Sequence, residues 1–253
     1  MNAELSDAAL LRYSRHILLP ELGVEAQAAF VNAHALIIGA GGLGSPVALY
    51  LAAAGVGTIT ICDHDEVDLT NLQRQIIHDM RGVGTAKVTS AKNRIAEMNP
   101  LVNVRAIQQK VLGEALDALV READIVLDCC DNFATRHAVN RACIAHKKPL
   151  VSGAGIRFDG QVCVYDPREA ESPCYHCLFP EGSAPEEVRC AVMGVFAPVT
   201  GIVGTIQAAE ALKVIANVGD ALVGRLLTID VLSMEFQEIR IPRDHGCAVC
   251  SAR

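Results

Sequence analysis

The sequence predicts an α/β protein: a Rossmann-like, mostly parallel sheet with helices on both faces, continued by antiparallel strands in the C-terminal half. Three observations support this prediction. An apolar segment runs into a glycine-rich turn and a helix near residue 40, and short β-branched segments alternate with helical ones up to about residue 150. Both patterns are typical of a doubly wound parallel sheet. After residue 159, apolar and polar residues alternate, which indicates antiparallel strands with one solvated face.

The uncharged segment 35–62 contains the first two strands and the helix between them. Its length alone would permit a membrane span, but glycines and a proline divide it into shorter elements. Residues 36–38 are expected to form a strand, and 46–54 a helix that stops at Gly55. Proline in a first helical turn and glycine just past the last one is the usual polarity of a helix. Residues 58–62 then form the second strand, so we expect a buried unit of a soluble protein and no membrane span.

Four glycines lie in the turn between the first strand and the helix: Gly39, Gly41, Gly42 and Gly44. Such glycines let backbone N–H groups at a helix N-terminus approach a phosphate, and the helix dipole favours the anion. Asp63 ends the second strand, where a carboxylate usually accepts hydrogen bonds from ribose hydroxyls. The combination predicts a nucleotide site. The alternative is a glycine-rich turn that serves packing alone.

The rest of the chain supplies further elements in alternation. We expect helices over 6–17, 24–32, 84–98, 114–121 and 134–146, and strands over 102–107, 124–128 and 149–153. Antiparallel strands are expected over 161–165, 225–230 and 235–241. The uncharged run 191–209 again reaches membrane length, but Pro198 and three glycines interrupt it. We interpret it as a loop that leads into a buried helix over about 199–217.

Composition restricts the possible classes of function. The formal net charge is −7, the pI is near 5.6 and no basic run occurs, which argues against a DNA-binding surface. Residues 1–11 lack the basic start and the apolar core of a signal peptide. We therefore expect a cytoplasmic protein. Its ten cysteines should be reduced, and should bind metal or react rather than form disulfides.

A polar segment follows Asp63, at the carboxyl end of a strand, where open α/β sheets bind their ligands. Arg74 offers two N–H groups to phosphate oxygens. Lys87 lies in the first turn of an expected helix, where a cation opposes the helix dipole; a polyphosphate would explain it, and a surface lysine without a role is the alternative. The segment also contributes further candidate nucleotide ligands: Asp65, Thr70, Asn71, Leu72 and Gln73.

Asp131 and Asn132 follow the strand expected over 124–128 and should face the same crevice as the glycine turn. Mg²⁺ in proteins usually takes one or two carboxylates together with substrate phosphates, so Asp131 is the candidate magnesium ligand. The alternative is that Asp131 caps the helix over 134–146, a role that Asp often fills.

Two C-x-x-C pairs lie far apart in the sequence, Cys174 with Cys177 and Cys247 with Cys250. Each pair can give two thiolates to one tetrahedral Zn²⁺. Four thiolates leave no open position, so the predicted zinc site is structural rather than catalytic. The fold would have to bring the pairs together, which would fix the C-terminal segment to the body. A redox pair or unrelated thiols are the alternatives.

Two further residues are weak candidates on spacing alone. Cys190 follows Arg189 in an expected surface loop, and a neighbouring cation lowers the pKa of a thiol. An ordinary loop thiol is the alternative for Cys190. Arg15 lies near the end of the first helix, where solvated cations are common.

Together these motifs resemble the MoeB/ThiF/HesA family, which shares its adenylation domain with the ubiquitin-activating enzymes. The resemblance rests on Asp63, Lys87 and these stretches: LRYSRH around Arg15, GAGGLGS at 39–45, TNLQRQ at 70–75, DCCDN at 128–132 and GAGIRFDGQ at 153–161. The paired C-x-x-C motifs and RCAVMGVFAP around Cys190 extend it over nearly the whole chain.

The resemblance implies one adenylation domain over 1–253: N-terminal helices (1–33), a nucleotide-binding half (34–155) and a carrier-binding and zinc half (156–253), with no rhodanese domain after it. The implied reaction is ATP-dependent adenylation of the C-terminal glycine of a small ubiquitin-like sulfur carrier that ends in Gly-Gly. The implied carrier is of the MoaD type, for molybdopterin synthesis, or of the ThiS type, for the thiazole of thiamine. The short chain and the YHCLF segment favour the MoaD type. A tRNA-modifying dehydratase is a third possibility.

The resemblance also implies roles for the residues. Asp63 would bind the ribose of ATP, Asp131 would hold Mg²⁺, and Arg15 would reach into the partner subunit's site, which implies a homodimer. The phosphates would contact Gly42, Asn71, Arg74 and Lys87, and Zn²⁺ would bind Cys174, Cys177, Cys247 and Cys250. Cys190 stands where some members form a covalent link to the carrier. A desulfurase or a rhodanese would supply the sulfur.

Two other classes of function share part of the pattern. An NAD-dependent dehydrogenase would have the glycine turn and Asp63, but it leaves Arg74 and Lys87 unexplained, and no hydride-transfer acid is evident. A non-catalytic scaffold that binds a ubiquitin-like partner would have lost residues of the phosphate site, and those residues are all present.

Overall fold

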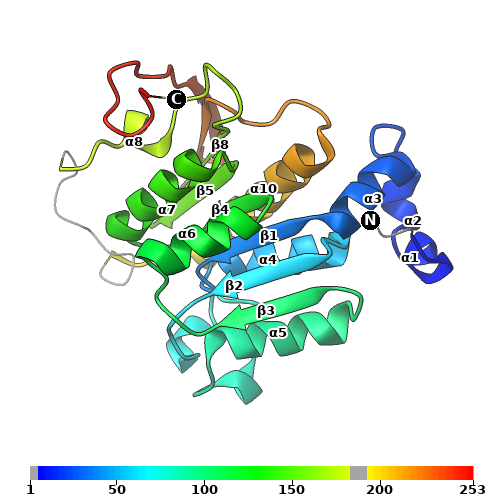
Figure 1. Cartoon of the computed structure of the whole chain (residues 1–253). Coiled ribbons are helices and arrows are strands. Elements are labelled where there is room, and N and C mark those ends of the chain that lie inside the picture. The colour runs from blue at the N-terminus through cyan, green and yellow to red at the C-terminus, as the bar shows by residue number, and fades with distance from the viewer. Residues whose placement is uncertain (1–4, 183–192, 253) are drawn as a thin grey trace.

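Five parallel strands form the first part of a single eight-stranded sheet, in the order β3-β2-β1-β4-β5-β6-β7-β8 (Figure 1). The computed structural model describes residues 5–182 and 193–252. The parallel strands are β1 (His34–Ile38), β2 (Thr58–Cys62), β3 (Asn103–Ile107), β4 (Ile125–Asp128) and β5 (Leu150–Ile156). The antiparallel strands are β6 (Asp159–Tyr165), β7 (Arg225–Asp230) and β8 (Glu235–Arg240). The predicted fold class is confirmed.

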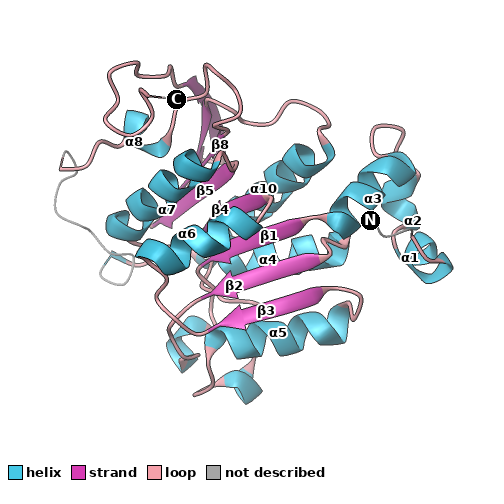
Figure 2. Ribbon diagram, viewed as in Figure 1, coloured by secondary structure: helices cyan, strands magenta, loops and turns pink. Residues whose placement is uncertain are grey.

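Helices cover both faces of the sheet (Figure 2). Along β1, Ile37 packs toward α4 (Gly44–Ala54), α5 (Lys87–Met98) and α10 (Ala197–Ala216), whereas Leu36 and Ile38 pack toward α6 (Gly113–Glu122) and α7 (Phe133–His146). The alternation follows from the two-residue period of a strand. Because both faces are covered, the central strands β1, β2 and β4 are almost entirely buried and mostly apolar, whereas the edge strand β3 has exposed residues.

Helix α10 begins earlier than the predicted helix over 199–217, because Pro198 lies within its first turn instead of preceding it. This helix is long and apolar enough to cross a membrane by length and composition. It packs against α4 and β5, and Gly204 permits this contact, since a Cβ there would lie 2.5 Å from the carbonyl oxygen of Leu43. Within the described residues, α10 therefore packs one face against α4 and the sheet.

The N-terminal helix predicted over 6–17 is divided into α1 (Asp7–Arg12) and α2 (Ser14–Ile17), followed by α3 (Gly23–Asn32). The division falls at Tyr13, which is buried, with its ring against Gly55 and its hydroxyl accepting from Asn99 Nδ2 at 2.9 Å. Anchoring this side chain is the physical reason for the break. Within residues 5–182, the short helical elements that were not predicted are the 3₁₀ helices η1 (Leu69–Asn71) and η2 (Met80–Gly82), and α8 (Tyr175–Leu178).

Candidate active site

A cavity of about 490 Å³ opens at the carboxyl ends of the parallel strands. Its volume lies in the range of small-molecule sites. Its wall comes from the glycine turn, the segment after β2, the loops after β3 and β4, and the β5–β6 hairpin. Many of the predicted nucleotide ligands line it: Gly39, Gly41, Gly42, Asp63, Asp65, Asn71, Arg74, Lys87, Asp131 and Asn132.

Some predicted residues do not line the cavity. Gly44 closes the turn instead, because a Cβ there would lie 1.9 Å from the carbonyl oxygen of Gly39. Thr70 is exposed and donates from Oγ1 to Asp68 Oδ1 at 2.6 Å. Leu72 and Gln73 also lie off the wall of the cavity.

Arg15 and Cys190 stand apart from the cavity wall for different reasons. Arg15 is exposed on α2 and does not line the cavity. In Figure 1, α1–α3 lie beyond the amino ends of the strands, at the opposite end from the arrowheads. Arg15 could therefore serve a cavity of this kind only in another subunit. Cys190 lies outside the described residues.

The glycine turn is held to the sheet by Asp63 and His78. Asp63 Oδ2 accepts from the backbone N–H of Ala40 at 2.7 Å, and its Oδ1 accepts from the N–H of Asp65 at 2.9 Å. The buried ring of His78 contacts the carbonyl oxygen of Ala40 through Nε2 at 3.1 Å. At Gly41 the turn is open, because an added Cβ would meet nothing closer than Gln75 Nε2 at 3.6 Å. The backbone at Gly41 is thus accessible to a ligand in the cavity.

Two cations of the cavity come from the polar segment and from α5. Lys87 is only 6% exposed, and its Nζ lies 2.8 Å from Asp65 Oδ2. Partial burial alone would raise the pKa of Asp65, but the hydrogen bond and the charge of Lys87 outweigh it and lower that pKa. Arg74 is half-buried and donates from Nη1 to the carbonyl oxygen of Thr70 at 3.1 Å. Each cation leaves N–H donors for the oxygens of an anion.

Asp131 carries an exposed carboxylate on the opposite side of the cavity. Within the described residues, this carboxylate accepts one long hydrogen bond, from Asn132 Nδ2 at 3.5 Å. The alternative role of Asp131 as a helix cap is wrong: Asn132 caps α7 by accepting from the N–H of Thr135 at 2.9 Å. An exposed carboxylate in the wall of this cavity suits Mg²⁺, which keeps most of its waters and takes few protein ligands.

Sequence reasoning missed a buried ion pair directly behind this loop. Asp128 ends β4 and is 1% exposed, and Arg136 in α7 is 6% exposed. Arg136 Nη1 lies 2.9 Å from Asp128 Oδ2, and Ser152 Oγ donates to the same oxygen at 2.8 Å. Asp128 belongs to the motif at 128–132, but its spacing does not distinguish a buried charge from a ligand. The Arg136 side chain lines the cavity.

Two other parts of the wall were missed. Gln75 is 3% exposed, lies next to Gly41, and its Oε1 has no hydrogen-bond partner. Gln109 and Lys110 follow β3. The reasoning applied to the ends of β2 and β4 applies equally to β3, so the position of Lys110 offered a usable signal.

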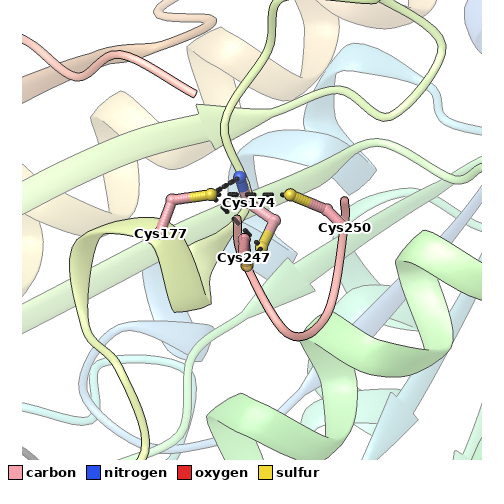
Figure 3. A group of neighbouring side chains, drawn as sticks. All are labelled: Cys174, Cys177, Cys247 and Cys250. Atoms are coloured by element: carbon pink, nitrogen blue, oxygen red, sulfur yellow. Dashed lines mark hydrogen bonds between the residues drawn. The ribbon is translucent and has the colours of Figure 1, made fainter. Parts of the chain in front are cut away.

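The four cysteines of the C-x-x-C pairs converge on one another (Figure 3), and none of them lines the cavity. The sulfur of Cys174 lies 3.7 Å from that of Cys247 and 3.8 Å from that of Cys177, and the sulfurs of Cys177 and Cys250 are 3.5 Å apart. A tetrahedral Zn²⁺ with Zn–S bonds near 2.3 Å requires sulfurs about 3.8 Å apart. No disulfide joins any cysteines of the described chain. The cluster therefore has the size of a four-thiolate metal site.

The surroundings favour a thiolate at Cys247, whereas burial raises the pKa of Cys174 and of Cys250. Burial alone would raise the pKa of Cys247, but backbone N–H groups of Val249 and Cys250 donate to its sulfur and lower the pKa to about 6. Asn140 in α7 donates from Nδ2 to the sulfur of Cys174 at 3.7 Å. These four sulfurs are close to one another and largely buried, so a metal bound to them would have no open position.

Comparison with models of known protein families assigns this chain to one of them. The model of the ThiF family matches residues 13–249. The chain belongs to the ThiF family. The resemblance inferred from the motifs is thereby confirmed.

Relatives within the ThiF family include proteins of two pathways. The chain is 42% identical to the sulfur carrier protein ThiS adenylyltransferase of Escherichia coli K12, over 97% of both chains. It is also 42% identical to the molybdopterin-synthase adenylyltransferase of the same organism, over 98% of this chain and 99% of the relative. The adenylyltransferase and sulfurtransferase MOCS3 of Anopheles gambiae is 42% identical over 98% of this chain, which spans 56% of that longer relative.

Solved structures show the same fold. The structure of E. coli MccB with ATP has a TM-score of 0.82 and 26% identity, covering 95% of this chain and 74% of MccB. MccB with MccA-N7isoASN gives a TM-score of 0.83 and 26% identity, covering 98% and 76%. These ThiF-family comparisons agree with the Rossmann-like sheet described above.

Proposed function

We propose that this protein is an adenylyltransferase that uses ATP to activate the C-terminal glycine carboxylate of a small ubiquitin-like sulfur carrier protein. The observation that carries the proposal is the match to two carrier adenylyltransferases, which covers nearly the full length of this chain and of each relative. The cavity supports it, because the glycine turn, Arg74, Lys87 and Asp131 surround one opening. The arrangement suits a nucleoside triphosphate better than NAD, since two cations and a free carboxylate face the space beyond the glycines.

In the proposed reaction, a carboxylate oxygen of the carrier attacks the α-phosphorus of ATP. The bond between the α-phosphorus and the bridging oxygen breaks, and pyrophosphate leaves with the electron pair. The carboxylate is already ionised near neutral pH, so no general base is needed. Catalysis then requires in-line positioning and neutralisation of the charge on pyrophosphate, which are the usual demands of phosphoryl-type transfer.

This chain's residues have matching tasks. The backbone at Gly41 and Gly42 would approach the phosphates, Asp63 would accept from the ribose, and Arg74 with Lys87 would bind the leaving pyrophosphate. Before ATP binds, the ammonium group of Lys87 is paired with Asp65, which holds it in the cavity wall. Bound Mg²⁺ would neutralise phosphate charge beside Asp131.

The carrier is proposed to be of the MoaD type, with the ThiS type as the second candidate. The two E. coli relatives match equally well, so identity does not separate them. The YHCLF segment favours the MoaD type. We further propose a zinc-loaded, cytoplasmic homodimer in which the partner's copy of the N-terminal helices supplies an arginine, with a desulfurase or rhodanese as the sulfur donor.

The test is ATP–pyrophosphate exchange with purified MoaD-type and ThiS-type carriers, each intact and without its terminal glycine. We expect exchange with one intact carrier and none with its truncated form. The Asp131→Asn variant should lose exchange by about 10²–10³-fold, the usual cost of removing one group that stabilises developing charge. Intact ATP binding without exchange for any carrier would overturn the proposal, and tight NADH binding would favour a dehydrogenase.

A further inference from the structure

The buried pair of Arg136 and Asp128 also holds the loop that carries Asp131. The Nη2 of Arg136 donates to the carbonyl oxygen of Cys130 at 2.5 Å, while Nη1 contacts Asp128. The Oδ1 of Asp128 accepts from the N–H of Cys130 at 3.1 Å. Both backbone groups of Cys130 are thus bound by the pair, and Asp131 is the next residue.

Beyond Asp131, the loop is fixed by the cap of α7. Asn132 accepts from the N–H of Thr135, and its own carbonyl oxygen accepts from the N–H of Arg136 at 3.3 Å. Among the residues that the structure describes, the side chain of Asp131 accepts only the long hydrogen bond from Asn132. Its carboxylate is therefore placed by the backbone on either side, at Cys130 and at Asn132.

Stability alone is a weak reason for this pair. A buried salt bridge often contributes no more to stability than apolar residues of the same size, although removing one partner is costly. A guanidinium also does here what an ammonium cannot, because its fixed fork reaches the carboxylate and the carbonyl oxygen together. The geometry of the pair suits the positioning of the loop, because Arg136 contacts the carboxylate of Asp128 and the carbonyl oxygen of Cys130 at once.

We propose that Arg136, held by Asp128, is a positioning residue that sets the affinity of the ATP-bound site for its divalent cation by fixing the loop of Asp131. The inference rests on the proposed function in so far as ATP is the nucleotide, and it concerns metal binding rather than the carrier. Outer residues that orient metal ligands typically contribute 10–100-fold to metal affinity.

The experiment measures Mn²⁺, in place of Mg²⁺, by electron paramagnetic resonance with a non-hydrolysable ATP analogue on the whole protein. Arg136→Lys keeps a cation beside Asp128 but cannot also reach Cys130. We expect its Mn²⁺ dissociation constant to rise by roughly 10-fold or more. Binding of the analogue without metal should change by less than about twofold, and the Mg²⁺ concentration for half-maximal exchange should rise in parallel.

Ser152→Ala is the matched control. It removes the hydrogen bonds of Ser152 to Asp128 and Arg136 but touches neither Cys130 nor the loop. It should lower the midpoint of thermal unfolding without weakening Mn²⁺ binding. A second test combines Arg136→Lys with Asp131→Asn: the double variant should bind Mn²⁺ no more weakly than Asp131→Asn alone, because both changes act through one carboxylate.

Several outcomes would overturn the proposal. They are an unchanged Mn²⁺ affinity in Arg136→Lys, an equal loss in Ser152→Ala, or fully additive losses in the double variant. Should Arg136→Lys fail to fold, Arg136→Gln with Asp128→Asn removes the pair without leaving an unpaired charge and must show the same loss. Absence of exchange in the wild type would reject the carrier proposal alone, because the Mn²⁺ measurement needs no carrier; a wild type that binds no Mn²⁺–nucleotide would reject both.

Discussion

The cavity and the cysteine cluster place their functional groups in opposite ways. In the cavity, the side chains come from several strand ends and loops, and Asp131, Asp65 and Arg74 keep exposed or half-exposed atoms. In the cluster, four sulfurs from two short segments lie within 4.8 Å of one another, and three of the four cysteines are fully buried. The polar groups of the cavity keep hydrogen-bonding capacity for a ligand, whereas the sulfurs of the cluster lie against one another.

This difference corresponds to two kinds of task. A site that binds and releases a substrate needs donors and acceptors that are free until the substrate arrives. A structural metal site is closed, with all positions of the metal taken by the protein. We therefore expect changes in the cluster to act mainly on stability, and changes in the cavity mainly on binding and turnover.

The largest effect is expected from Cys174→Ala. Loss of one of four ligands from a buried metal site should lower the free energy of unfolding by more than about 4 kcal/mol, as for other losses of a structural metal. Chemical denaturation and metal content by mass spectrometry measure the two effects. Nucleotide affinity of the folded fraction should fall by about tenfold or less.

Cys143→Ala is the control for Cys174→Ala, because Cys143 is equally buried but lies in α7, outside the cluster. It should keep its metal and lose little stability. If Cys174→Ala lost nucleotide binding to the same extent as metal, the contrast between cluster and cavity would fail, because the cluster would then be part of the nucleotide site.

A smaller effect is expected in the cavity from Gly41→Ala. The new Cβ would meet no protein atom closer than 3.6 Å, so the free energy of unfolding should stay within about 0.5 kcal/mol of the wild type. It would occupy the space through which a phosphate approaches the backbone. The dissociation constant of ATP, measured by calorimetry, should therefore rise by roughly tenfold, or about 1.4 kcal/mol.

Gly44→Ala is the matched contrast, because its Cβ would lie 1.9 Å from the carbonyl oxygen of Gly39. Here the unfolding free energy itself should fall, by about 1–3 kcal/mol, the usual cost of overpacking. Wild-type ATP affinity in Gly41→Ala would show that no phosphate comes near this backbone.

The smallest effect concerns pH. Burial lowers the pKa of His78 and the charge of Lys87 adds to this shift, while the hydrogen bond to the Ala40 backbone and the charges of Asp63 and Asp79 oppose it. Because the folded-state pKa lies below the unfolded value near 6.5, the unfolded chain binds the proton more readily. Stability should therefore fall as the pH drops below about 6.5, with a slope of at most about 1.4 kcal/mol per pH unit for this group.

The measurement for His78 is urea unfolding from pH 7.5 to 5.5 for the wild type and for His78→Gln, whose amide can still reach Ala40. The variant should show a shallower decline. His34 and His137 also have pKa values lowered by burial, so part of the decline will remain. An identical slope in both proteins would show that His78 does not titrate in this range.

Local patterns in the sequence were enough to predict most of the fold. Period-two and apolar runs located the strands, and proline at the start and glycine after the end located α4. The spacing of the C-x-x-C pairs predicted a cluster that the fold then assembled from both ends of the C-terminal half. Each of these features depends on neighbours in the sequence, and that is the information that a single sequence contains.

The missed features depend on tertiary contacts that no motif spacing specifies, whether the residues are far apart in the sequence or, like Asp128 and Arg136, only eight positions apart. Tyr13 breaks a helix because it packs against Gly55 and Asn99. Arg136 is an ordinary helical residue by spacing, and only the adjacency of α7 to the end of β4 pairs it with Asp128. The motif at 128–132 indicated a site, but it could not separate the exposed carboxylate of Asp131 from the buried one.

One helix connects the two regions that were compared. On α7, Arg136 reaches the loop of the cavity, and one turn later Asn140 accepts from the N–H of Tyr175 at 2.9 Å and contacts the sulfur of Cys174. Displacement of this helix along its axis would move both sets of contacts. Coupling between two binding events is reciprocal: whatever factor the metal adds to nucleotide affinity, the nucleotide adds to metal affinity. For a zinc-loaded cluster that strengthens nucleotide binding through this helix, reciprocity requires that bound ATP reduce the loss of zinc to a chelator.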